Sequence, residues 1–506
     1  MDVEKKITSS KPMHPDDITA ANNVRGHIRQ DDESSDMKVA EVLDAFGNEE
    51  GAEVQYKTMT WWQGSLVMIA ENISLGILSL PAVLAKCGLI GGLIAIIGLG
   101  IFSTYSGYVL WQFKMRFPQI TNYADIGGVL LGPWGREIFG IAYVIYCIFC
   151  MASHILTFTI AMNVLTNHAS CTIVWGVVGL AVFTFLSLNR TLKNVSFLSI
   201  ISFTSILSAV MLTMIALGVS PRAAAGVMKG TYSPNFPSAF NSISNVVFAY
   251  GGHVAWVSFI AELRDPKEFP KSLVLLQAVD ISLYFIAAIV IYRYAGEDVA
   301  SPALNSNTPI IRKIAWGIAL PTIIIAGVIF AHVTVKYVYL RVFSGTKYLN
   351  SRGWVATGSW VGLAIGTWTI AWIIAESIPV FSDLLGFISA LFASWFSYGL
   401  PGICWFYINW GTCTRSAKKI GLTLMNVTLI LLGCIICFVG LYASGYSMAA
   451  DASNSNGGFL GKQAKSGMGF HWWFFVKRVY IRVSWARAWE QDCIIGRIDD
   501  ILYNSG

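Results

Sequence analysis

Hydrophobic stretches recur along most of the chain and are separated by short polar segments. Many reach the roughly 20 apolar residues that an α-helix needs to cross the hydrocarbon core of a bilayer. We expect an all-α integral membrane protein in a lipid bilayer. Its eleven transmembrane helices are predicted at about 61–86, 88–112, 137–165, 172–189, 195–219, 239–261, 271–295, 314–335, 357–377, 381–408 and 421–444.

Polar segments flank this apolar region. Residues 1–57 have mixed charge and no sustained periodicity, and no signal peptide is evident, so we predict a disordered cytosolic tail. Residues 58–445 form the predicted transmembrane domain, and 446–506 an atypical C-terminal tail. The apolar run after about 460 is too short to span, although Trp472 and Trp473 could rest at a membrane interface.

Two spans contain polar residues and glycines that indicate breaks in their helices. Glu71 to Gly76 interrupts the first span, and Gly251-Gly252 interrupts the sixth. Irregular backbone survives in a membrane only where protein encloses a cavity, and such breaks often bind the solute of a transporter. The breaks lie in spans 1 and 6, so equivalent positions are offset by five spans, an odd number, and spans 1–5 and 6–10 would run in opposite directions. This predicts a leucine-transporter-type 5+5 inverted repeat with broken helices 1 and 6, plus an eleventh span.

Composition narrows the functional classes. Hydrophobic residues make up 55% of the 506 residues and charged residues 13%, which excludes a soluble protein. The net charge of +6 comes from cations in short loops, so nucleic acid is not an expected partner. The nine cysteines and the histidines show no metal-binding pattern, and no cofactor is expected. A membrane enzyme would need clustered catalytic groups, and a channel would need continuous polar faces.

Lysine and arginine in the loops predict the orientation, because they favour the cytoplasmic side. A cytosolic N-terminus places fifteen in inner loops and six in outer loops. The inner set is Lys114, Arg116, Arg136, Arg190, Lys193, Arg264, Lys267, Lys271, Lys336, Arg341, Lys347, Arg352, Arg415, Lys418 and Lys419; the outer set is Lys86, Arg222, Lys229, Arg293, Arg312 and Lys313.

Two blocks resemble the signatures of a known family. LVMIAENISLGILSLPAVLAKCGLIGG in span 1 and SNVVFAYGGHVAWVSFIAELRDPKEFPKSL around span 6 resemble the amino acid/auxin permease family, within the amino acid–polyamine–organocation superfamily. The likeness is greatest to fungal neutral amino acid permeases. It covers about 58–445 and implies eleven spans and proton- or sodium-coupled amino acid uptake. Ala70 stands where sodium-coupled members carry asparagine, and Ser74 where many members carry glycine.

The broken helices predict a site for a zwitterion. Backbone N–H groups near Ser74 to Gly76 would face the substrate carboxylate, and carbonyls near Phe248 to Tyr250 would face its ammonium group. Glycines would let the substrate approach the backbone. The predicted substrate-binding residues are Ser74, Leu75, Gly76, Phe248, Ala249, Tyr250, Gly251 and Gly252.

Ionisable groups inside spans tend to face cavities, because burial in lipid is costly. We predict Glu71 and His253 as proton-coupling residues. His154 and His332 are expected to be interior histidines with satisfied hydrogen bonds. Three further residues of span 7, Gln277, Asp280 and Tyr284, share one face and indicate a hydrogen-bonded seam between helices. Glu376 and Asp383 are expected near the outer surface, where solvation is favoured over a gating role.

The sequence therefore favours a proton-coupled symporter of neutral aliphatic or aromatic amino acids, not an enzyme. The alternatives are an amino acid sensor or receptor on a transporter fold, and a vacuolar exporter. The expected location is the plasma membrane, with the vacuolar membrane as the alternative. The amino acid preference and the oligomeric state stay open.

Overall fold

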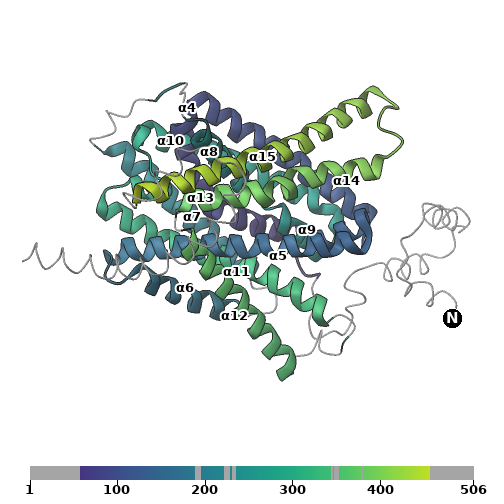
Figure 1. Cartoon of the computed structure of the whole chain (residues 1–506), viewed down its shortest axis with the longest axis horizontal. Coiled ribbons are helices and arrows are strands. Elements are labelled where there is room, and N and C mark those ends of the chain that lie inside the picture. The colour runs from purple at the N-terminus through teal and green to yellow at the C-terminus, as the bar shows by residue number, and fades with distance from the viewer. Residues whose placement is uncertain are drawn as a thin grey trace, which may run out of the picture.

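The computed structural model describes residues 57–188, 195–220, 228–230, 235–343, 346, 353–378 and 380–455. In these ranges the chain forms a bundle of helices (Figure 1). Their one strand-like pairing is an isolated bridge between Met59 and Leu263. The predicted all-α fold class is therefore confirmed. The tail predictions fall almost wholly outside the described residues.

The helices are named by their order along the chain. They are α4 (Trp61–Arg116), α5 (Tyr123–Thr166), α6 (Thr172–Leu186), α7 (Val195–Val219), α8 (Phe236–Ala249), α9 (His253–Glu262), α10 (Phe269–Ala295), α11 (Pro309–Phe343), α12 (Trp354–Ser377), α13 (Phe381–Ile388), the π-helical η6 (Ser389–Gly399), α14 (Leu400–Asn409) and α15 (Ala417–Ser455). Three short 3-10 helices complete the described elements: η3 (Pro266–Glu268), η4 (Gly296–Asp298) and η5 (Ala303–Ser306).

Nine helical stretches in the described ranges are long and apolar enough to cross a membrane. One of them, α4, has 56 residues, about 84 Å of helix, and a bilayer core is about 30 Å thick. It bends at Gly88 (φ 77°), where the first two predicted spans meet. The shorter apolar helix α6 occupies most of the predicted fourth span. Dividing α4 at its bend and adding α6 would give eleven crossings, a number that stays a prediction.

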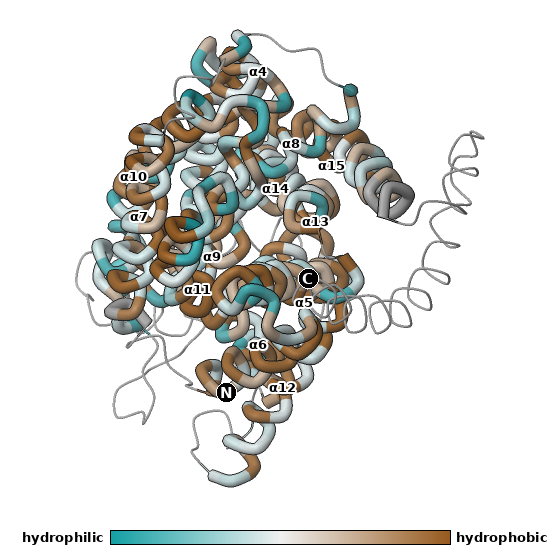
Figure 2. Tube along the Cα trace, turned by 90° about the vertical axis from the view of Figure 1, so that its left-hand side faces the viewer, coloured by the Kyte–Doolittle hydropathy of each residue, from teal (hydrophilic) through white to brown (hydrophobic). Residues whose placement is uncertain are grey.

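The outer faces of the bundle are apolar. Ile94 of α4, Ile141 of α5, Val274 of α10 and Phe438 of α15 are all exposed. Figure 2 shows hydrophobic residues, in brown, along the outer helices α5, α10, α11 and α12. Such side chains would contact lipid, which agrees with the predicted membrane location.

The segment 114–137, expected to be a loop, is partly helical. α5 begins at Tyr123, and the side chain of Asn122 caps it by accepting a hydrogen bond from the backbone of Asp125. The helix then bends at Gly132 (φ 69°). The two arms approach so closely that a Cβ on Gly127 would lie 2.4 Å from the carbonyl oxygen of Gly135. The capping residue and the small residues together explain why this polar segment is ordered as helix.

Only one of the two predicted helix breaks is present. α8 ends at Ala249 and α9 begins at His253, so Tyr250–Gly252 interrupts the sixth span as expected. The first span is different, because Gly88 is the sole residue of α4 with non-helical backbone angles. The helix therefore runs through Glu71–Gly76 without a break, and this part of the prediction is corrected.

Close helix packing accounts for the glycine in the unbroken span. A Cβ on Gly76 would lie 2.6 Å from the Cα of Ala249 in α8. Gly76 is therefore required by the contact between α4 and α8. Further along α4, Pro81 lacks the N–H that a continuous helix would donate, yet the helix continues past it. The hydroxyl of Ser79 donates to the carbonyl of Gly76 in the same turn, at 2.8 Å.

Polar contacts join the ends of the interrupted span to its neighbours. Asp383 of α13 is buried, contrary to its expected solvation, and accepts hydrogen bonds from Asn241 of α8 and Ser447 of α15. At the other end, Lys336 of α11 forms a buried ion pair with Glu262 of α9, with an Nζ to Oε1 distance of 2.7 Å. Both halves of the sixth span are thus anchored to other helices.

Candidate functional site

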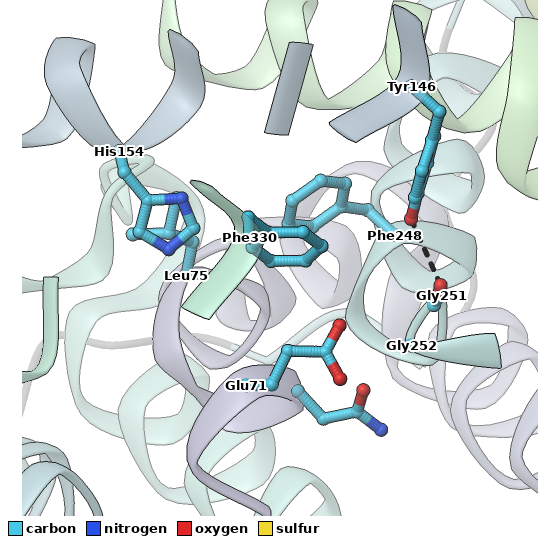
Figure 3. A pocket seen from close by; sticks show the side chains of 9 residues that line it. Glu71, Leu75, Tyr146, His154, Phe248, Gly251, Gly252 and Phe330 are labelled. Carbon is cyan, nitrogen blue, oxygen red and sulfur yellow. Dashed lines mark hydrogen bonds between the residues drawn. The ribbon is translucent and has the colours of Figure 1, made fainter. Parts of the chain in front are cut away.

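A small cavity lies between the unbroken first span and the interrupted sixth span. About 10 Å³ of space is enclosed there, which is room for roughly one water molecule. An amino acid is larger, so its binding requires the walls to move apart. Figure 3 shows the side chains that converge on this space. The lining residues are Glu71, Asn72 and Leu75 of α4, Tyr146 and His154 of α5, Phe248 of α8, Gly251 and Gly252 of the break, and Phe330 of α11.

Tyrosine hydroxyls hydrogen bond to the carbonyls that the break releases. Tyr146 donates to the carbonyl of Gly251 at 2.9 Å, the bond drawn in Figure 3. Tyr284 of α10 donates to the carbonyl of Ala249 at 2.9 Å and to that of Asn72 at 3.0 Å. In this conformation these carbonyls already have partners. The expected ammonium contact at Phe248–Tyr250 would therefore require some of these bonds to open.

Glycine is needed at the floor of the cavity. A Cβ on Gly252 would lie 2.1 Å from Oδ1 of Asn72, 2.6 Å from Nε1 of Trp256 and 2.8 Å from Oε2 of Glu71. These three polar atoms are buried and have no hydrogen-bond partner among the described residues. The broken span thus brings bare backbone against the polar side chains of α4.

Two buried carboxyl groups lie near each other beside the cavity. Glu71 is 5% exposed, and Asp280 of α10 is fully buried. Asn72 links the first span to Asp280, because its Nδ2 donates to Oδ2 of Asp280 at 2.9 Å. The side chain of Asn72 also lies close to that of Glu71, because a Cβ on Gly252 would be 2.1 Å from Oδ1 of Asn72 and 2.8 Å from Oε2 of Glu71. Oε2 of Glu71 and Oδ1 of Asp280 both lack a partner among the described residues.

The two interior histidines near the break occupy different places. His154 lines the cavity. Its Nδ1 lies 2.8 Å from the carbonyl oxygen of Cys150 and must donate, because a carbonyl can only accept. In the neutral ring Nε2 is then the acceptor, and it accepts from the hydroxyl of Ser74 at 3.3 Å. His253 does not line the cavity. Its Nε2 donates to the carbonyl of Ser103 at 3.1 Å and lies 2.8 Å from the hydroxyl of Ser106.

The structure brings together part of the predicted site. Glu71, Leu75, Phe248, Gly251 and Gly252 line the cavity. The other predicted residues lie behind its walls: Gly76 and Ala249 form the helix contact, Ser74 bonds to His154, Tyr250 packs on Tyr284, and His253 faces the second half of α4.

Sequence reasoning missed four lining residues: Asn72, Tyr146, His154 and Phe330 were not among the predicted binding residues. Tyr146 and His154 are eight residues apart, so they share one face of α5, and this spacing was a usable signal. Asn72 follows Glu71 directly in the sequence. Phe330 is one of many aromatic residues in the spans, and no local pattern distinguishes it.

Known proteins resemble the chain over most of its length. A family model described as "Transmembrane amino acid transporter protein" matches residues 57–445. The "N amino acid transport system protein" of Neurospora crassa is 35% identical over 431 residues, which cover 81% of this chain and 91% of that protein. The "Amino acid transporter AVT1H" of Arabidopsis thaliana is 24% identical, and the aligned region covers 77% of this chain and 90% of that protein.

A solved structure shares the fold. The crystal structure of MhsT in complex with L-phenylalanine superposes with a TM-score of 0.52 and 14% identity, covering 77% of this chain and 98% of that one. At this identity the likeness shows the fold alone. It confirms the leucine-transporter type of fold that the spacing of the two signature spans predicted.

Proposed function

Since the chain belongs to the amino acid/auxin permease family, we propose that it is a secondary active transporter that carries neutral amino acids together with protons. Membership of this family of amino acid transporters favours transport over an enzymatic role. The observation that carries the finer proposal is Glu71. It is a buried carboxyl group on the wall of the cavity, with one oxygen lacking a partner among the described residues.

The cavity wall is suited to a neutral zwitterion. Leu75, Phe248 and Phe330 provide apolar surface, and the wall has no lysine or arginine to pair with an acidic side chain. α9 begins directly after Gly252 without a side-chain cap, and the positive end of its helix dipole favours a carboxylate. Glu71 would accept from the substrate ammonium group. Because α4 is unbroken, this assigns the carboxylate contact to α9 in place of Ser74–Gly76.

A proton gradient provides enough energy for uphill uptake. One proton that crosses a potential of about 100 mV releases about 2.3 kcal/mol, and one pH unit adds about 1.4 kcal/mol. The total, about 3.7 kcal/mol, corresponds to accumulation of several hundredfold. A transporter needs a group that binds the proton with the substrate and releases it inside. In the low dielectric around Glu71, the protonated carboxyl is favoured over the charged one.

The test is Glu71→Gln in proteoliposomes. Glutamine keeps an acceptor oxygen but cannot exchange a proton. We expect the variant to retain exchange of labelled neutral amino acid. Its accumulation of that amino acid on an imposed pH gradient should be at least tenfold lower than that of the parent. Accumulation equal to that of the parent would reject Glu71 as the coupling residue. If the parent binds amino acid but shows neither exchange nor uptake, the sensor alternative replaces transport.

We also propose a cytosolic N-terminus and a plasma-membrane location. The lysine and arginine bias of the loops supports this orientation. The resemblance of the two signature blocks to fungal uptake permeases favours the cell surface over the vacuolar membrane. A cysteine introduced at Lys267 should resist an impermeant thiol reagent applied to intact cells. Labelling of that cysteine would reverse the orientation.

A further inference from the structure

Asp280 is a buried ionisable group to which the proposed function assigns no role. It does not line the cavity, yet Asn72 connects it to the cavity wall through the 2.9 Å bond to its Oδ2. Its other oxygen, Oδ1, is buried and lacks a partner among the described residues. A structural acceptor would be expected to have both oxygens satisfied, as most buried polar atoms are.

No described cation neutralises this pair of acids. None of the described side chains around Glu71 and Asp280 is a cation; they are Asn72, Tyr146, Cys147, Cys150, Tyr250 and Tyr284. His154 lines the same cavity, and its Nδ1 proton is engaged with Cys150. The buried lysine of α11, Lys336, forms an ion pair with Glu262 instead.

Two negative charges in such surroundings would be very costly. Neighbouring carboxylates of a buried site do not both ionise readily, because each charge opposes the other and neither is hydrated. Both can ionise when the cavity opens to water. When the cavity closes, the pair must therefore take up a positive charge, and a proton is the smallest one available.

We propose that Asp280 and Glu71 form one coupled proton-binding pair, in which Asp280 sets the pH at which Glu71 takes up the transported proton. This rests on the proposed proton-coupled function. The closed, loaded site then holds one proton shared by the pair, and the substrate ammonium group balances the remaining carboxylate charge. Asp280 is a positioning residue in this scheme, because it acts through Glu71 and does not touch substrate.

The experiment is the dependence of uptake on external pH at a constant membrane potential. Asp280→Asn removes the neighbouring charge while its side-chain oxygen can still accept from Asn72. Glu71 then binds a proton less tightly, so the midpoint of proton-driven uptake should move to lower pH, by roughly one unit or more. If Asp280 were purely structural, Asp280→Asn would lower uptake by the same factor at every pH.

A second variant predicts a shift in the opposite direction. The hydrogen bond from Asn72 stabilises the ionised form of Asp280, so Asn72→Ala should strengthen proton binding by the pair and move the midpoint to higher pH. The Asn72→Ala variant tests the coupled pair even if Asp280→Asn does not yield folded protein. Glu268→Gln removes an acidic group on the surface beside α10 and is the matched control, with an unchanged midpoint.

The outcomes separate the two proposals. If the parent shows no uptake driven by a pH gradient, the proposed coupling itself fails. If the parent is driven by protons and neither variant moves the midpoint, or both move it in the same direction, the coupled pair is overturned. Opposite shifts, with the control unmoved, support it.

Discussion

α4 runs through Glu71–Gly76 as a continuous helix, whereas Tyr250–Gly252 separates α8 from α9. The two segments face each other across the cavity and contribute different chemistry. The continuous helix contributes side chains: the carboxyl of Glu71 and the amide of Asn72. The interrupted one contributes backbone: bare glycines, released carbonyls and the N-terminus of α9.

The difference shows where an interruption can be stabilised. The carbonyls of Ala249 and Gly251 accept from the hydroxyls of Tyr284 and Tyr146, which come from other helices. A released backbone group in a membrane needs such a partner. In α4 the corresponding glycine, Gly76, is used for helix contact with α8. A continuous helix that carries the carboxyl group of Glu71 thus faces an interrupted segment whose released carbonyls accept hydrogen bonds from other helices.

The largest expected effect comes from enlarging Gly76. A Cβ there would lie 2.6 Å from the Cα of Ala249, which is backbone and cannot turn away as a side chain can. Gly76→Val should therefore prevent α4 from packing on α8 and remove most of the folded protein, measured by size-exclusion chromatography in detergent. Gly98→Val in the same helix is the control, because nothing lies within 4 Å of its added Cβ. Equal yields of both would contradict the packing role.

An intermediate effect is expected at Gly252. Its Cβ would meet the ends of the Glu71, Asn72 and Trp256 side chains, which can move. Gly252→Ala should therefore fold, but displace the acid from the cavity and reduce uptake at least tenfold. Gly251→Ala is the milder comparison, since its Cβ would lie 3.0 Å from the carbonyl oxygen of Phe248. If the first variant transports as well as the parent, the cavity does not place the substrate beside Glu71.

The smallest effect is expected from Tyr146→Phe. This change removes one hydrogen bond, the one to the carbonyl of Gly251, worth about 1 kcal/mol. We expect about a fivefold loss in apparent substrate affinity, measured by concentration-dependent uptake. Tyr284→Phe should have the larger effect, because that hydroxyl bonds to carbonyls of both spans. If Tyr146→Phe lowers the apparent affinity more than Tyr284→Phe does, these hydrogen bonds do not stabilise the break in the way proposed.

The sequence by itself determined the membrane fold. Each run of apolar residues is visible within a short stretch of sequence, so the sequence predicted the helices and the boundary between the first two spans at Gly88. The glycine pair at 251–252 correctly predicted the interruption of the sixth span. Part of the cavity wall, including Glu71 and Phe248, also followed from these two signature spans.

Tertiary structure decided what local pattern leaves ambiguous. Polar residues and a glycine in an apolar helix indicate either a break or a close contact, and only the position of Ala249 showed that Gly76 makes a contact. The histidines were equally ambiguous, because the direction of a buried side chain depends on its partners: Ser106 holds His253 away from the cavity, while His154 points into it. Asp280 becomes a partner of Glu71 only because α10 packs against α4, which places residues more than two hundred positions apart around one asparagine.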